Sequence, residues 1–165
     1  MNESYAEAGC KKRDTVSTYL VKGLLVFLVV SSILATLLLP LFAMIAIIVI
    51  SVSVVFYRKL DVEYEYIFCD GQIDFDRITA GRKRKTMKKI DFDQVEICAP
   101  LNSHALDNYK NQDFKEIDFA SHAANVTTYA VIVRDQGNMS KILFEPNEKM
   151  LECIRAKAPR KIVFE

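Results

Sequence analysis

The strongest pattern in this chain is an uncharged and mostly apolar run near the N-terminus, at residues 23–57. A single straight helix of that length would measure roughly 52 Å, whereas the hydrocarbon core of a bilayer is about 30 Å thick. Pro40 lies near the middle, where it disfavours helical geometry at the preceding residue and suits the first turn of a following helix. The run therefore predicts two transmembrane helices, at residues 16–39 and 41–57.

The charges that flank this hairpin, residues 16–57, predict its orientation. Basic residues precede or begin the first helix and follow the second, at Lys11, Lys12, Arg13, Lys22, Arg58 and Lys59. Positive residues favour the cytoplasmic side of a membrane, and the turn around Pro40 carries no charge. We therefore expect a multi-pass protein of the cell membrane, with a short cytoplasmic N-terminus at residues 1–15 and a cytoplasmic C-terminal part.

The apolar run has two alternative interpretations. A cleaved signal peptide would have an apolar core of about 7–15 residues and a small-residue cleavage site, and this run fits neither. A re-entrant hairpin stays open, because the turn has no polar side chains to cap its carbonyl groups. Small residues also recur at four-residue spacing on the first helix, which permits close helix contact in lipid; they are Ser31, Ser32, Ala35 and Thr36.

From residue 61 the pattern changes to alternating apolar and polar positions, which is typical of half-buried strands. The pair Asp70-Gly71 separates the first two strands and is a strong hairpin signal. The alternation predicts seven strands, at residues 62–69, 72–79, 83–92, 95–99, 115–120, 127–134 and 141–145.

After Pro146 the pattern becomes helical. Asn147 is a good N-cap for a helix at residues 147–157, with Met150, Leu151 and Ile154 on one apolar stripe. The final residues place Ile162 and Phe164 on one face and predict a further short strand. Residues 61–165 are thus expected to form one soluble, mostly β domain that ends in a helix.

Seven strands followed by one helix resemble the pleckstrin-homology (PH) superfold, a curved and partly open β-barrel with a C-terminal helix. The resemblance covers residues 62–158. It rests on Phe68-Cys69-Asp70-Gly71 with Ile73, on residues 89–95, and on residues 129–146 running into the helix. The whole chain resembles a family of small bacterial membrane proteins with two N-terminal helices and a bacterial PH-like domain. The fold class expected is thus membrane-anchored α+β.

The basic lipid-binding motif of eukaryotic PH domains lies around the first hairpin. Here that hairpin is Asp70-Gly71, with acidic neighbours, so the resemblance does not imply phosphoinositide binding. The densest charge is elsewhere, at Arg82, Lys83, Arg84, Lys85, Lys88 and Lys89. Near a cytoplasmic leaflet, such cations would contact anionic lipid headgroups or an acidic protein partner. The alternative is a solvated hairpin edge, on which lysines discourage strand-to-strand aggregation.

Other candidate chemistry is sparse. The four cysteines form no C-x-x-C pair and lack histidines at ligand spacing, so no metal site or other cofactor is expected. His104 and His122 have no nucleophile arrangement around them in the sequence, and no enzyme is predicted. Residues 58–165 carry 18 basic and 18 acidic groups, and this balance gives no long-range attraction to nucleic acid.

Two classes of function follow from these patterns. The first is a membrane-tethered binding or scaffold module, in which the β domain docks a protein or lipid. The second is an accessory or regulatory subunit of a larger membrane protein complex, in which the helices make the main contacts. The small residues of the first helix are the sequence support for the second.

Overall fold

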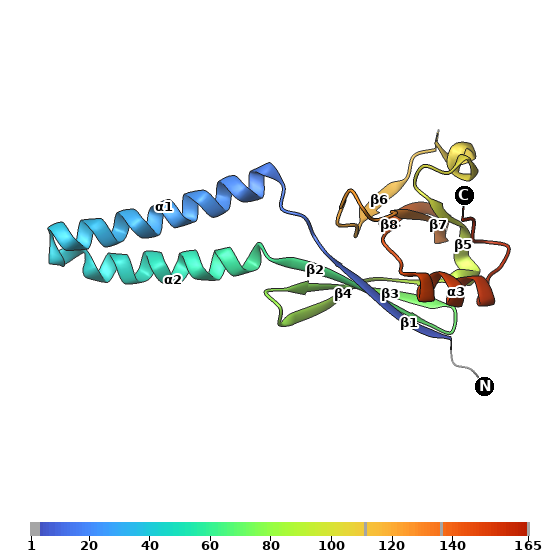
Figure 1. Cartoon of the computed structure of the whole chain (residues 1–165), viewed down its shortest axis with the longest axis horizontal. Coiled ribbons are helices and arrows are strands. Elements are labelled where there is room, and N and C mark those ends of the chain that lie inside the picture. Colours follow the sequence, from blue (N-terminus) through green and yellow to red (C-terminus); the bar gives the residue numbers. More distant parts are fainter. Residues whose placement is uncertain (1–3, 111, 136, 165) are drawn as a thin grey trace. The chain divides into compact units, whose positions relative to one another are not determined.

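The computed structural model describes residues 4–110, 112–135 and 137–164 of the chain. It divides into two compact units. A helical unit comprises Arg13–Val62 with Thr79–Lys83, and a β unit comprises Met1–Lys12, Glu63–Ile78 and Arg84–Glu165. Each unit is described by itself below, and the elements are labelled in Figure 1.

The helical unit is built from two apolar helices and a tight turn. Helix α1 spans Val16–Leu38, the 3-10 helix η1 spans Pro40–Phe42, and α2 spans Ala43–Lys59. Leu39 is extended (φ −140°, ψ 107°) because the following proline disfavours helical backbone there, and this ends α1. Val16–Leu38 and Pro40–Lys59 are each long and apolar enough to cross a membrane, judged by length and composition. The two helices predicted from the sequence are therefore present, and the second begins and ends two residues later than predicted.

Small residues line the contact between the two helices. On α2, Ala46 and Ser53 are the buried residues of the helix. On α1, the hydroxyl groups of Ser32 and Thr36 donate to the carbonyls of Val29 and Ser32 at 2.8 and 2.9 Å. These hydroxyls are thus satisfied within their own helix. At the other end of α1, Lys22 is paired with Asp14, and its ammonium lies 5.7 Å from the centre of the Tyr57 ring.

The first sheet of the β unit has the strand order β1-β2-β3-β4. Its strands are β1 (Tyr5–Lys11), β2 (Val62–Cys69), β3 (Gln72–Thr79) and β4 (Lys83–Asp91). The β2–β3 connection is the predicted hairpin turn, with positive φ at both Asp70 (45°) and Gly71 (98°). The sequence predicts β2 and β3 with these bounds, and β4 with an end one residue later.

Strand β1 is the main difference from the sequence prediction, which treats residues 1–15 as a tail. It pairs antiparallel with β2 along its whole length, from Tyr5↔Cys69 to Lys11↔Glu63, and Figure 1 shows it in blue beside β2. At Gly9, an added Cβ would lie 2.9 Å from the carbonyl oxygen of Tyr64, so the two strands approach each other too closely there for a side chain. The sheet is therefore completed by a strand that precedes both helices.

The second sheet has the order β5-β7-β8-β6. Its strands are β5 (Val95–Pro100), β6 (Lys115–Asp118), β7 (Tyr129–Asp135) and β8 (Asn138–Phe144). Strand β6 runs parallel to β8, and the other two pairings are antiparallel. Short 3-10 helices lie at Phe92–Gln94 (η2) and His104–Tyr109 (η3). The predicted C-terminal strand is a single bridge, in which Ile162 pairs with Cys98 of β5.

These strands correct the expected architecture of one seven-stranded, partly open barrel. The described residues instead form eight strands in two separate four-stranded sheets, followed by helix α3 (Glu148–Lys157). The additional strand is β1, which lies outside the stretch where the sequence alternates between large apolar and polar residues.

Aromatic side chains fill the core of the β unit. Tyr66, Phe75 and Phe144 are fully buried, and the Tyr66 ring meets the other two edge-on at 5.7 and 5.6 Å between centroids. Phe75 also stacks on Phe119 at 5.0 Å. Such pairs add about 0.5–1.5 kcal/mol each beyond the burial of their area.

Helix α3 seals this core through part of the predicted stripe. Asn147 caps the helix by accepting a hydrogen bond from the backbone N–H of Met150 at 2.8 Å. Met150 and Ile154 are fully buried, whereas Leu151 is only half-buried. The side-chain amide of Asn147 also donates to the carbonyl of Glu7 in β1 at 2.8 Å. The cap therefore ties α3 to β1.

We predict that replacing Ile154 with Asp destabilises the β unit much more than the same change at Leu151. An aspartate at position 154 would be a buried and unpaired charge in place of a packed side chain, at a cost on the order of 3–5 kcal/mol. Denaturant unfolding followed by near-UV circular dichroism measures the difference; the signal comes from tyrosines, since the chain has no tryptophan. Equal midpoints for the two variants would contradict the assignment of Ile154 as the inward position.

We further predict that residues 62–164 do not fold stably without β1. The strand contributes the backbone hydrogen bonds along the edge of β2, and it places Ala8 opposite Tyr66 and Ala6 opposite Phe68. A single chain that joins residues 4–12 to residues 62–164 through Asn-Gly, a strong two-residue hairpin turn, should restore folding. Amide hydrogen exchange of β2 compares the two fragments. Equal protection of β2 in both would show that β1 is dispensable.

Candidate functional site

The six basic residues singled out from the sequence fall into two groups, of which the first is used inside the β unit. The Nε of Arg84 donates to Asp76 at 2.5 Å, and its guanidinium also pairs with Glu65. Lys89 bonds Asp74 at 2.5 Å, and Lys88 pairs with an acid of β7 at 3.2 Å. Arg84, Lys88 and Lys89 are therefore partnered by acids of β2, β3 and β7.

Asp76 explains why Arg84 is held in place. This aspartate is 5% exposed, and its Oδ1 is buried without a hydrogen-bond partner among the described residues. A buried carboxylate is costly unless it is paired. The hydrogen bond to Asp76 raises the pKa of Arg84 above its usual range, and the guanidinium compensates the charge of the carboxylate. The contact between Arg84 and Asp76 therefore stabilises the sheet.

The second group is Arg82, Lys83 and Lys85, which are all exposed. No ion pair to any of the three is present among residues 4–110, 112–135 and 137–164. Arg82 lies in the turn between β3 and β4, and Lys83 and Lys85 lie at the start of β4. We call this turn, together with the first three residues of β4, the basic turn. Of the six candidate contact residues, these three are thus the ones without an ion pair in the described part of the chain.

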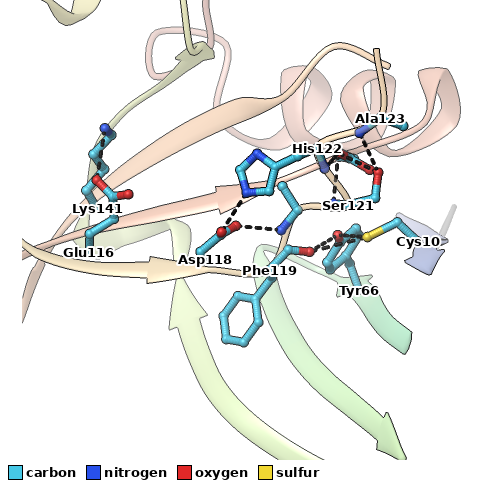
Figure 2. Close-up of polar contacts among 11 residues, drawn as sticks. Cys10, Tyr66, Glu116, Asp118, Phe119, Ser121, His122, Ala123 and Lys141 are labelled. Carbon is cyan, nitrogen blue, oxygen red and sulfur yellow. Dashed lines mark hydrogen bonds and ion pairs between the residues drawn. The ribbon is translucent and has the colours of Figure 1, made fainter. Parts of the chain in front are cut away.

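A second polar cluster, drawn in Figure 2, fastens the segment after β6. The Tyr66 hydroxyl donates to the carbonyl of Phe119 at 2.6 Å, and the thiol of Cys10 lies 2.9 Å from the same hydroxyl. Burial raises the pKa of Tyr66, and it raises the pKa of Cys10 to about 11. Both groups are thus uncharged at neutral pH. They join β1, β2 and this segment by hydrogen bonds between neutral groups.

Glu145, at the end of β8, completes this fastening. It is 5% exposed, and its Oε1 accepts hydrogen bonds from the backbone N–H of Ser121 at 2.9 Å, the Ser121 hydroxyl at 3.0 Å and the N–H of His122 at 3.1 Å. Three donors on one oxygen satisfy this buried carboxylate. They also hold His122 at a positive φ of 57°, a conformation that non-glycine residues rarely adopt.

The arrangement of Ser121, His122 and Asp118 differs from that of a catalytic triad. The Nε2 of His122 lies 2.6 Å from Asp118, while the Ser121 hydroxyl is engaged with Glu145. A nucleophile needs a hydrogen bond to its base, and here the serine and the histidine have separate partners. The other histidine, His104, is paired with an aspartate in its own 3-10 helix at 3.1 Å.

The hollows of the β unit have mixed charge. One of about 420 Å³ lies beside the β2–β3 turn and the end of α3. The ammonium of Lys161 spans part of it, donating to the carbonyls of Phe92 and Asp93 at 2.7 and 2.9 Å, and Lys157 pairs with Asp70 at 2.9 Å. No group of three or more metal-binding side chains is present in the described part of the chain.

Comparison with known proteins gives the family. A model of the family described as "Bacterial PH-like domain (DUF6106)" matches residues 2–164. The chain belongs to this family. The match includes β1 and both helices, so the helical hairpin is part of the matched PH-like chain. No curated protein and no solved structure matches the chain.

Sequence reasoning missed two parts of this PH-like chain that matter for its polar contacts. Glu145 ends an apolar strand, but its burial depends on donors that lie more than twenty residues away in the sequence. Cys10 lies in β1, which the apolar pattern does not reveal. A weak signal for β1 exists in the alternation of Ala6, Ala8 and Cys10 with Tyr5, Glu7 and Gly9.

The different surroundings of Arg84 and Lys85 give a matched pair of substitutions. Arg84→Ser leaves the buried carboxylate of Asp76 unpaired and should lower the melting temperature of the PH-like chain in detergent by several degrees. Lys85→Ser removes one exposed charge and should change it by less than about 3 °C. Differential scanning fluorimetry of both variants tests this. If the two melting temperatures agree, the Arg84 contacts do not contribute to stability.

Proposed function

We propose that this chain is an integral membrane protein whose helices α1 and α2 span the bilayer and hold a PH-like binding or scaffold module at its cytoplasmic face. One observation carries the proposal. Strand β1 leads into α1, strand β2 follows α2, and the two strands pair directly, with Lys11 opposite Glu63. Two paired strands lie on one side of a membrane. The segment between them must therefore enter and leave on that side.

The lengths of the helices support full spans over a re-entrant hairpin. Helix α1 has 23 residues, and the segment Pro40–Lys59 has 20. At 1.5 Å per residue these correspond to about 34 and 30 Å, which matches the roughly 30 Å of the hydrocarbon core. A re-entrant loop needs only part of that depth, and it leaves apolar side chains of both helices in contact with water.

The proposed cytoplasmic side follows from charge. Lys11, Lys12 and Arg13 precede α1, and Arg58 and Lys59 end α2, while the turn around Pro40 is neutral. Positive flanks of this kind favour the cytoplasm.

A binding role is proposed for the β unit because its candidate catalytic groups are engaged elsewhere. Ser121 bonds Glu145, and His122 bonds Asp118. The alternative role as an accessory subunit drew on the small residues of α1. Those residues are half-buried in the two-helix unit, and the hydroxyls of Ser32 and Thr36 are satisfied within α1.

The topology is tested by cysteine labelling in cells. In a variant that lacks the four native cysteines, Leu41→Cys places a thiol at the turn between the helices, and Lys59→Cys places one at the cytoplasmic end of α2. We expect a membrane-impermeant maleimide to label position 41 in intact cells and position 59 only after permeabilisation.

Each other labelling pattern would overturn one part of the proposal. Labelling of position 59 from outside would reverse the orientation. No labelling of position 41 until detergent is added would favour a re-entrant hairpin. Purification in mild detergent and mass measurement then separates the two functional classes, since an accessory subunit co-purifies with a stoichiometric partner.

A further inference from the structure

The position of the basic turn in the sheet is informative. The first sheet is a meander in the order β1-β2-β3-β4, and the short β2–β3 and β3–β4 connections join antiparallel neighbours. In such a meander, the first and third connections lie at the same end. The first connection contains α1 and α2, and the third is the basic turn. The basic turn therefore lies at the end of the sheet from which the helices depart.

A hydrogen bond joins the basic turn to the base of α2. The N–H of Ala80, the first residue after β3, donates to the carbonyl of Asp61 at 3.0 Å. Asp61 is the second residue after Lys59, the last residue of α2. Thr79–Lys83 accordingly forms one compact unit with the helices. Arg82 and Lys83 thus lie close to the end of α2, because Ala80, which precedes them in the turn, is hydrogen-bonded to Asp61.

The side chains of the basic turn are free to face outward from the sheet. Successive residues of a strand point to opposite faces. Arg84 points to the face that carries Asp76 and Glu65, so Lys83 and Lys85 point to the other face. Both lysines are exposed, as is Arg82. Three cations thus lie next to the membrane end of the sheet without acidic partners among the described residues.

We propose that Arg82, Lys83 and Lys85 bind the headgroups of anionic lipids in the same bilayer that holds α1 and α2. This inference rests on the proposed membrane insertion and adds a ligand and three residues to it. Phosphate-bearing headgroups accept hydrogen bonds from lysine and arginine, and their negative surface potential attracts cations within about one Debye length.

The experiment is lysine footprinting of the full-length chain in nanodiscs. One set contains phosphatidylcholine alone, and the other contains phosphatidylcholine with phosphatidylglycerol. A water-soluble acetylating reagent modifies exposed amines, and mass spectrometry gives the rate at each lysine. We expect Lys83 and Lys85 to react about fivefold more slowly in the anionic nanodiscs, which is the factor for one cation held at an anionic surface. Lys149, exposed on α3, should react equally in both.

Salt and substitution make the result specific. The protection of Lys83 and Lys85 should disappear at 1 M salt, where the Debye length falls to about 3 Å. Arg82→Ser should weaken the protection of the two lysines. The matched control Lys149→Ser removes the same charge from the chain and should leave it unchanged.

Two outcomes would overturn the proposal. Equal rates at Lys83 and Lys85 in both kinds of nanodisc would show that the basic turn does not contact lipid. Protection in both, unaffected by salt, would show that the lysines are covered by protein. Co-migration of the chain with nanodiscs on size exclusion is scored separately. A chain that fails to co-migrate contradicts the proposed insertion, whereas a chain that co-migrates with unprotected lysines contradicts only the lipid contact.

Discussion

The pairing of β1 with β2 is the interaction on which the rest of this structure depends. It joins a strand that precedes the two apolar helices to a strand that follows them, in an unbroken register from Tyr5↔Cys69 to Lys11↔Glu63. The helices are thus an insertion between two neighbouring strands of one sheet. An insertion of this kind must return to where it began. The hairpin form of the helices therefore follows from the sheet as well as from the position of Pro40.

The same pairing links the order of folding to the arrangement of the chain. Strand β1 carries small inward side chains, Ala6, Ala8 and Cys10, opposite the aromatic row of β2. Small residues on an edge strand contribute little apolar area, so the strand is held mostly by backbone hydrogen bonds and by polar contacts such as Asn147 to Glu7. The N-terminal segment precedes the helices in the chain, whereas β2 and the other strands of the core follow them. The edge is completed when the N-terminal segment, synthesised first, lies on the same side of the hairpin.

How far the fold could be predicted from the sequence depended on how each strand obtains its stability. Strands β2 and β3 alternate large apolar with polar residues around a two-residue turn, so local pattern alone predicts their bounds. Strand β1 lacks large apolar residues, and its partner lies beyond the helices, so no local pattern marks it. The parallel pairing of β6 with β8 and the separation into two sheets depend on contacts between distant segments. The periodicity of the sequence does not indicate such long-range contacts.

The candidate site shows the same division between local and distant information. The cluster of cations after Gly81 is plain in the sequence, because charge density is a local property. Which of those cations are available depends on acids in β2, β3 and β7, and only the structure shows that Arg84 and both lysines of the second half are already paired.

This partition also bears on the alternative explanation of the basic residues, which is protection of an exposed edge. Strand β4 is an edge of its sheet, and lysines on an edge discourage pairing with other chains. That role requires charge along the strand, and Lys88 and Lys89 satisfy it even while they are paired. Lys83 and Lys85 also lie on this strand, whereas Arg82 lies in the turn before it, where there is no strand edge to protect. Ala80 of this turn bonds Asp61, just after α2, so Arg82, Lys83 and Lys85, which have no ion pair among the described residues, lie where the proposed insertion would bring an anionic surface. Edge protection alone therefore leaves Arg82 without a role, and the proposed lipid contact gives it one.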